Sequence, residues 1–230
     1  MIKIGFMEYK NLIGGKVSNN IAIYNCDNME LLRQTPDNYY SLALVDPPYK
    51  IASQQKRGVG SRIDKSGKMN TWNDVLPTKE YFDELFRVSK NQIIWGANNF
   101  EGLPRSEYFT LWNKMQSVDN FASLEYAWVS MGVGKPAKMF TYSIHKVMAE
   151  RKAEGGKIHP TQKPVKLYEW LLINYAKEGD KILDTHLGSG SIAIACHNLK
   201  FDLTACELDK DYFDASLKRL KQHQSQLTMF

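Results

Sequence analysis

Cysteine is scarce in this chain, with three residues in 230, all far apart in the sequence. An odd number of widely spaced cysteines predicts neither a disulfide framework nor a zinc site. Long apolar runs are also missing, because no stretch approaches the roughly 20 residues of a membrane-spanning helix. The first ten residues have no long apolar core and do not look like a signal peptide. We therefore expect a cytoplasmic chain with no metal and no membrane segment.

A strong excess of charge is lacking too, since the formal net charge is only +5. The charge is unevenly distributed, however. Lys50–Lys68 holds six basic residues against one acid, and Lys135–Lys157 holds six against two. The rest of the chain is mildly acidic. Either segment alone would be interpreted as a solvated loop, but the two loop-like segments together favour a polyanionic partner.

Apolar content is high enough for a single folded domain spanning residues 1–230, because hydrophobic residues make up 43% of the chain. Short apolar runs alternate with amphipathic stretches. This pattern is typical of an α/β fold with a mostly parallel sheet and helices on both faces. The expected strands are residues 21–24, 40–45, 92–95, 108–112, 124–129, 181–184 and 203–206. The expected helices are residues 28–34, 191–199 and 212–220, one capped by Thr78 and one beginning at Pro164.

The motif Asp46-Pro47-Pro48-Tyr49 follows an apolar run, residues 42–45. Open α/β sheets bind their ligands at the carboxyl ends of strands. Two prolines end the strand and leave nearby carbonyls without backbone donors. A carboxylate and a free carbonyl can both accept hydrogen bonds from one amino group, and a tyrosine ring can stack on a planar base. The motif predicts a pocket for the exocyclic amine of a nucleobase, and the alternative is a simple strand-end turn.

A second motif, residues 182–191, combines a strand end, the turn Gly188-Ser189-Gly190 and a helix start. Glycines let a ligand approach the backbone closely. The spacing matches neither a dinucleotide fingerprint nor a P-loop. Glu207, 17 positions after Gly190, ends the next strand and can accept hydrogen bonds from ribose hydroxyls. These features favour a nucleoside cofactor without a pyrophosphate, and the alternative is plain strand–helix packing.

Together the two motifs resemble the β class of amino-methyltransferases, which use S-adenosylmethionine to methylate the exocyclic amine of adenine or cytosine in DNA. The resemblance spans about residues 21–215 and includes Asn25-Cys26-Asp27 and the run His159-Pro160-Thr161-Gln162-Lys163-Pro164. It implies a Rossmann-like methyltransferase fold. The chain departs from the family at residues 184–186, where Asp-Thr-His replaces the usual Asp-Pro-Phe. We expect His186 to be a surface substitution, the alternative being a pocket residue.

The resemblance also implies roles for individual residues. The catalytic residues would be Asp46, Pro47, Pro48 and Tyr49, with Asp46 and the Pro47 carbonyl holding the target amine and Tyr49 stacking on the flipped base. The cofactor would be bound by Asp27 at its adenine end, by Glu207 at its ribose, and by Asp46, Thr161, Gln162, Lys163, Asp184, Gly188, Ser189 and Gly190 around its methionine and ribose portions. Because the methyl group of a sulfonium is already activated, direct transfer needs no metal.

Double-stranded DNA is the partner that the resemblance implies. The residues expected to bind it are Lys50, Lys56, Arg57, Arg62, Lys65, Lys68, Lys135 and Lys138. Residues 132–157 are the expected target-recognition insertion. About two dozen residues are few for reading a DNA site, so we expect help from a second subunit of a homodimer or from the 50–74 loop.

Adenine N6 is favoured as the acceptor, because the family usually pairs a leading aspartate with adenine and a leading serine with cytosine. The alternative of the same class is methylation of cytosine N4, and other acceptors would be RNA or a protein amide. A different class of function is a catalytically silent nucleic-acid-binding protein on the same fold. The expected biological setting is restriction-modification.

Overall fold

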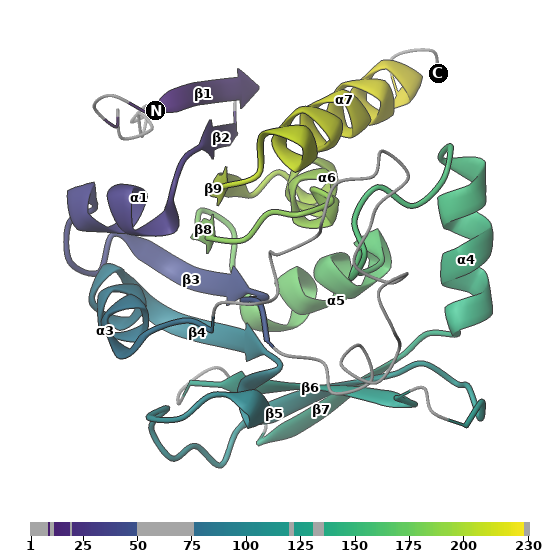
Figure 1. Ribbon diagram of the computed structural model, residues 1–230, viewed down its shortest axis with the longest axis horizontal. Coiled ribbons are helices and arrows are strands. Elements are labelled where there is room, and N and C mark those ends of the chain that lie inside the picture. Colours follow the sequence, from purple (N-terminus) through teal and green to yellow (C-terminus); the bar gives the residue numbers. More distant parts are fainter. Residues whose placement is uncertain are drawn as a thin grey trace, which may run out of the picture.

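The computed structural model describes residues 9, 12–18, 20–49, 76–119, 122–130 and 136–227. Within these residues, one nine-stranded sheet carries helices on both faces (Figure 1). In spatial order the strands are β1 (Ile13–Ser18), β2 (Ile21–Asn25), β9 (Asp202–Glu207), β8 (Lys181–Asp184), β3 (Tyr40–Val45), β4 (Ser89–Trp95), β6 (Leu124–Val129), β5 (Phe109–Asn113) and β7 (Ala137–Thr141). The predicted α/β fold is confirmed.

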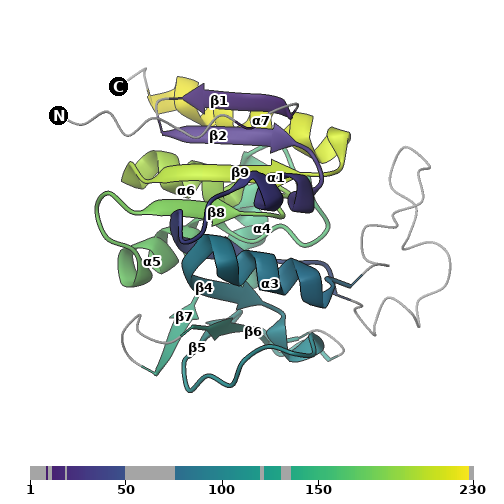
Figure 2. The same cartoon turned by 90° about the vertical axis from the view of Figure 1, so that its left-hand side faces the viewer.

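The middle of the sheet is parallel, and its two ends are not. β2, β9, β8, β3 and β4 run parallel to one another. β1 pairs antiparallel with β2, and β6 is antiparallel to both β4 and β5. Figure 2 shows the strands stacked from β1 at one end to β5 and β7 at the other. The carboxyl ends of the five parallel strands therefore lie along one edge, where an open α/β sheet binds its ligands.

Two helical layers enclose the sheet (Figure 1). α1 (Asn28–Gln34) and α3 (Lys79–Val88) lie on one face, and α5 (Val165–Tyr175), α6 (Ser191–Leu199) and α7 (Lys210–Leu227) lie on the other, with α4 (Ile144–Ala153) beside the second layer. Alternation along β3 matches the two layers, because successive side chains of a strand point to opposite faces. Leu42 and Leu44 belong to the core under α5 and α6, and Ala43 and Val45 belong to the core under α1 and α3.

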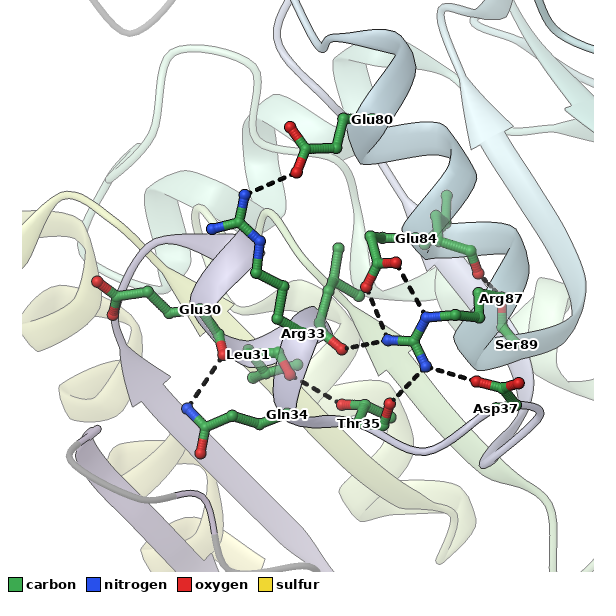
Figure 3. A network of polar contacts seen from close by, with 12 residues as sticks. Glu30, Leu31, Arg33, Gln34, Thr35, Asp37, Glu80, Glu84, Arg87 and Ser89 are labelled. Carbon is green, nitrogen blue, oxygen red and sulfur yellow. Dashed lines mark hydrogen bonds and ion pairs between the residues drawn. The ribbon is translucent and has the colours of Figure 1, made fainter.

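Arg87 fastens the first helical layer near the end of α3 (Figure 3). Its guanidinium contacts both carboxylate oxygens of Glu84, at 2.9 and 2.7 Å, and Oδ1 of Asp37 at 2.7 Å. It also donates to the backbone carbonyls of Leu32 and Thr35 at the end of α1, at 2.9 and 2.8 Å. Charge-assisted and bidentate hydrogen bonds of this kind are among the stronger ones in proteins. The carboxyl-terminal end of α1 is therefore held against α3.

Four elements differ from the sequence predictions, namely β1, β7, α4 and α7. β1 was not expected, because its exposed sequence includes Gly14 and Gly15 at φ +117° and +137°. The segment Lys135–Lys157 is not a loop throughout, since it contains β7 and α4. Its apolar signal is weak because β7 is half exposed and α4 buries only Val147. The last helix is also longer than predicted, and Lys50–Lys68 lies outside the described residues.

A pair of glycines, Gly155 and Gly156, joins α4 to the residues that follow. Gly155 and Gly156 have φ values of +92° and +115°, in the left-handed region that favours glycine. A Cβ atom at either position would meet nothing within 4 Å. The joint is therefore surrounded by open space, in contrast to the glycines at the strand ends described below.

Further expectations concern cysteines, metals and membranes. Cys26, Cys196 and Cys206 are free and buried. Among the described residues, no group of three or more His, Cys, Asp or Glu side chains is arranged to hold a metal ion. In the same part of the chain, no helix has the length and apolar character needed to cross a membrane.

Candidate active site

A cavity of about 770 Å³ lies at the carboxyl ends of the parallel strands. Its walls come from segments that are distant in the sequence: 26–29 after β2, 46 and 48 after β3, 185–189 after β8, 207–212 after β9, and 159–163 before α5. Pockets of a few hundred to about 1,000 Å³ are typical of cofactor and small-molecule sites. The structure therefore brings the two predicted motifs to one cavity.

The glycine turn after β8 is tied to the acid at the end of β9. The Gly188 N–H donates to Oε2 of Glu207 at 2.7 Å, and Oε1 of the same carboxylate accepts from the Asp209 N–H at 2.9 Å. Burial raises the pKa of Glu207. Gly188 has φ +52°, and a Cβ there would lie 3.4 Å from the ring of His159. Gly188, Ser189 and Glu207 all line the cavity.

Two residues predicted for the same site, Asp184 and Gly190, do not line the cavity. Asp184 is buried, and its Oδ1 accepts from the His186 N–H at 2.9 Å. Burial raises its pKa to about 8. Gly190 has φ +72° just before α6, and a Cβ there would lie 3.0 Å from Cβ of Ser216. Both residues therefore support the shape of the turn without contributing to the cavity surface.

Asp27 and the run before α5 line other parts of the cavity. Oδ1 of Asp27 accepts from the Met29 N–H at 2.7 Å and so caps α1. The Thr161 hydroxyl is 3.2 Å from Nδ1 of His159. Gln162 is buried, and its Oε1 accepts from the Ile158 N–H at 3.1 Å. These side chains are held by local bonds at the wall where the resemblance predicted them.

His186 is a pocket residue, so the expectation of a surface substitution is wrong. Its Nδ1 lies 2.9 Å from the Thr185 hydroxyl and its Nε2 lies 3.1 Å from Nδ2 of Asn28. The ring packs edge-on against Tyr81, with centroids 5.4 Å apart. Burial lowers the pKa of His186 to about 3, so the imidazole is neutral at physiological pH. The histidine ring thus packs against Tyr81 and forms a hydrogen bond at each of its two nitrogens.

The motif predicted to be catalytic, residues 46–49, meets the cavity through Asp46 and Pro48, whereas Pro47 and Tyr49 do not line it. Oδ2 of Asp46 accepts from Nζ of Lys163 at 2.5 Å. Oδ1 of Asp46 is buried and has no hydrogen-bond partner among the described residues. Burial raises the pKa of Asp46, and the Lys163 ammonium opposes that effect. A buried acceptor without a partner costs free energy, which makes Oδ1 ready for an incoming donor.

Tyr49 is partly buried beside the cavity. Its ring lies edge-on to Phe100 with centroids 6.3 Å apart. Burial raises the pKa of Tyr49 to about 12, so its phenol is neutral. A neutral aromatic ring at this position suits stacking on a planar base.

Lys163 makes a second ion pair that motif reasoning missed. Its Nζ is 3.2 Å from Oε2 of Glu125 on β6, and Oε1 of Glu125 is 2.6 Å from Nζ of Lys114. Lys163 is 3% exposed at its side chain. The sequence did carry a signal for this contact, because Glu125 is a charged residue inside the otherwise apolar run 124–129. We predicted that run only as a strand.

Arg219 on α7 supports the glycine turn from the other side and was also missed. Its Nη1 donates to the Ser189 carbonyl at 3.0 Å and to the Ser191 hydroxyl at 2.9 Å. Its Nη2 pairs with Glu154, just after α4, at 2.7 Å. Arg151 on α4 donates to the Gln162 carbonyl. The segment containing α4 is thus bonded to two walls of the cavity.

Most residues predicted to bind DNA lie outside the described residues: Lys50, Lys56, Arg57, Arg62, Lys65, Lys68 and Lys135. Lys138 is described and lies on β7. Its Nζ is 3.3 Å from both the carbonyl and Oδ1 of Asn174, and 4.7 Å from the ring centroid of Tyr175. Its ammonium therefore contacts α5 in this structure.

Comparison with known proteins assigns the family. A family model described as DNA methylase matches residues 102–218. The type II methyltransferase M.HpaI of Haemophilus parainfluenzae is 32% identical over 85% of this chain and 73% of its own length. The type II methyltransferase M.HinfI of Haemophilus influenzae is 24% identical over 87% of this chain and 68% of its own length.

Solved structures show the same fold. The PvuII DNA methyltransferase, described as cytosine-N4-specific, matches with a TM-score of 0.59 at 16% identity and covers 94% of each chain. The complex of M1.HpyAVI with S-adenosylmethionine matches with a TM-score of 0.56 at 19% identity, over 86% of this chain and 99% of the other. The chain belongs to the DNA methylases, as a β-class amino-methyltransferase whose cofactor is S-adenosylmethionine.

Proposed function

We propose that this protein transfers a methyl group from S-adenosylmethionine to N6 of adenine in double-stranded DNA, in a restriction-modification setting. The observation that carries the proposal is the free, buried Oδ1 of Asp46 at a cavity shared with the glycine turn. An amine that enters this cavity finds an acceptor already desolvated and held in place by Lys163. Preorganised acceptors of this kind are an effective source of rate acceleration.

The residues around the cavity fit the cofactor. A volume of about 770 Å³ accommodates a nucleoside joined to an amino acid together with an entering base. Glu207 offers carboxylate oxygens to ribose hydroxyls. Asp27 lines the cavity together with its neighbours Asn28 and Met29. Leu208, 69% exposed, provides an apolar surface for a flat ring. When bound, S-adenosylmethionine supplies an electrophilic methyl group.

The chain's own residues prepare the amine. The lone pair of an exocyclic amine is delocalised into the base ring, and accepting its hydrogens at Asp46 favours a pyramidal, nucleophilic nitrogen. Tyr49 would hold the base by stacking, so that positioning contributes most of the rate. Reaching the amine in a duplex requires extrusion of the base, which costs a few kcal/mol.

One consideration supports adenine over cytosine, and two others favour neither base. The motif is led by aspartate, which in the resembling family accompanies adenine. The acceptor Oδ1 of Asp46 can serve either base, because both carry an exocyclic amine. The cytosine-N4-specific PvuII enzyme shares the fold at only 16% identity, so it does not argue for cytosine here.

The DNA-binding surface is proposed to include residues 132–157 and the basic segment Lys50–Lys68. Phosphate contacts by such residues are weakened by salt. α4 is exposed on most of its surface and is bonded to the cavity walls, which suits a target-recognition element. A second copy of the chain on the same DNA would extend this short segment. The three free thiols and the DNA substrate support a cytoplasmic location.

The test is incubation of the protein with unmethylated DNA and labelled S-adenosylmethionine, followed by nucleoside mass spectrometry. We expect N6-methyladenine from the wild type and loss of at least about 100-fold in rate for Asp46→Asn, since its acceptor is weakened and its ion pair lost. Asp37→Asn, on the surface beside Arg87, is the control. Detection of N4-methylcytosine instead would identify cytosine as the acceptor base and contradict the choice of adenine. Cofactor binding without any methylated base would support the silent DNA-binding alternative.

A further inference from the structure

Two charged side chains of the antiparallel part of the sheet extend toward the catalytic motif. Glu125 lies on β6, opposite Trp112 of β5, and Lys114 directly follows β5. Their ion pair is 2.6 Å long, and their side chains are only 16% and 21% exposed for Lys114 and Glu125. Neither residue belongs to the motifs from which the site was predicted. Charges that are so far removed from water require a structural or functional reason.

The pair continues into the active site without a break. Glu125 Oε2 accepts from Lys163 at 3.2 Å, and Lys163 donates to Asp46 Oδ2 at 2.5 Å. The result is an alternating chain of two lysines and two acids with no net charge. Burial acts to lower the pKa of Lys163, but Asp46 and Glu125 together raise it well above its usual value. Burial acts to raise the pKa of Glu125, but Lys163 and Lys114 together lower it.

The geometry restricts what Lys163 can do to Asp46. An ammonium has three donors and no acceptor. One donor of Lys163 is directed to Asp46 Oδ2 and another to Glu125, while the same nitrogen lies 5.3 Å from the ring centroid of Trp95. Because the ammonium is held from two sides, it contacts one oxygen of Asp46 and leaves Oδ1 without a partner among the described residues.

We propose that Glu125, anchored by Lys114, is a positioning residue that keeps Lys163 on Oδ2 of Asp46 and so leaves Oδ1 available to the target amine. The inference rests on the proposed function for the role of Asp46. Without the negative charge of Glu125, the Lys163 ammonium interacts with Asp46 alone. It then takes up more of the acceptor strength of that carboxylate and can move onto Oδ1. Glu125 thus acts on the reaction through Lys163 and touches no substrate.

The informative variant is Glu125→Gln, which keeps the size of the side chain and removes its charge. Glu84→Gln is a matched control, because the Glu84 side chain has the same exposure, 21%, and also forms an ion pair. Its partner is Arg87, at 2.7 Å, in the α1–α3 layer. We expect Glu125→Gln to lower kcat for DNA methylation by about 10- to 100-fold while the Kd for S-adenosylmethionine changes less than about 3-fold. Glu84→Gln should lower thermal stability and leave kcat within about 2-fold.

A second measurement keeps the inference testable whatever the enzyme methylates. In protein labelled with 15N at lysine side chains, the Lys163 ammonium signal, assigned with Lys163→Met, should shift in Glu125→Gln and stay unchanged in Glu84→Gln. Lys114→Met should give a smaller shift and a smaller loss of kcat, because Glu125 stays in place but is less firmly held.

The outcomes separate the two proposals. A wild type that methylates DNA, with Glu125→Gln matching Glu84→Gln in kcat, overturns the positioning role and leaves the proposed function intact. An unchanged Lys163 signal in a folded Glu125→Gln variant overturns it as well. A wild type that methylates no base overturns the proposed function. In that case the ammonium signal alone tests whether Glu125 positions Lys163: a shift in Glu125→Gln supports that placement, and an unchanged signal overturns it.

Discussion

The ring of Tyr49 packs directly on the backbone of Gly96, so that a Cβ atom at residue 96 would overlap its Cε1 atom. Gly96 follows β4, the neighbour of the strand that leads into the catalytic motif. Its φ of +68° lies in the region that favours glycine. The position of the predicted base-stacking ring is therefore set by the end of the adjacent strand as well as by the motif itself.

Replacing Gly96 with alanine should displace Tyr49. We expect Gly96→Ala to lower kcat/KM for DNA by at least about 10-fold, because the stacking ring moves from its position. The matched control is Gly102→Ala, at φ +79° with nothing within 4 Å of its Cβ. Both variants carry a backbone strain of about 1–2 kcal/mol, so Gly102→Ala measures the loss of stability that comes from the backbone alone. Equal methylation rates in the two variants would contradict the role given to Tyr49.

Arg219 should matter for cofactor affinity. Removing its guanidinium in Arg219→Met leaves the Ser189 carbonyl and the Ser191 hydroxyl without their donor, so the glycine turn loosens. We expect the Kd for S-adenosylmethionine to rise by about 5- to 10-fold, measured by calorimetry, since one or two hydrogen bonds are lost. Glu154→Gln keeps Arg219 in place and weakens only the ion pair with its 40% exposed partner. An affinity for that variant as low as for Arg219→Met would assign the effect to the ion pair instead.

His186 should make the protein sensitive to acid. Its pKa is lowered from 6.5 to about 3 by burial, so the folded state keeps it neutral where the unfolded state protonates it. The stabilisation is therefore present above about pH 6.5 and is lost as the pH falls toward 3, by up to about 1.4 kcal/mol per pH unit. The Tm should fall between pH 7 and pH 5, and the fall should be smaller in His186→Phe. His159, whose pKa burial also lowers to about 3, adds to the fall, whereas Asp184, whose pKa burial raises to about 8, opposes it equally in both proteins.

The control for this titration is His145→Phe, at an exposed position on α4. Its fall in Tm should equal that of the wild type. If His186→Phe also shows the full wild-type fall, another group is responsible for the acid sensitivity.

Exchanging the segment 132–157 for that of a relative with a different target should transfer the target preference. The described part of this segment is anchored by Phe140 and Val147, which pack against the main core. These two positions should be kept so that the fold survives. Sequencing that detects methylated bases should then report the donor's site, whereas an unchanged site would exclude the segment as the recognition element.

The fold could be predicted well where each element carries its own signal. β3 contains the continuous apolar run 42–45, and α1 and α3 follow the capping residues Asp27 and Thr78, so their bounds followed from local patterns. β7 and α4 gave no such signal, because each exposes most of its surface. The two motifs also indicated that their residues would lie close together, since both follow parallel strands.

Other parts of the site depend on contacts between distant residues. Lys163 and Asp46 are 117 positions apart, and only the folded sheet brings them together. Glu125 could have been noticed as a charge inside an apolar strand, but its two lysine partners could not be read from spacing. His186 was misjudged because a histidine beside a glycine turn is compatible with either exposure or burial, and Asn28 and Tyr81, which enclose it, come from other elements.

The open joint at Gly155 and Gly156 has a consequence for how such a protein can change. It lies between α4 and the run that lines the cavity, outside every strand ladder of the described sheet. Surface connections tolerate added residues at a small entropic cost, about 0.6 kcal/mol for each doubling in length. Extra sequence can therefore be inserted at this joint without altering strand register or the glycine turn. The joint is a place where an added module can be accommodated while the cavity keeps its walls.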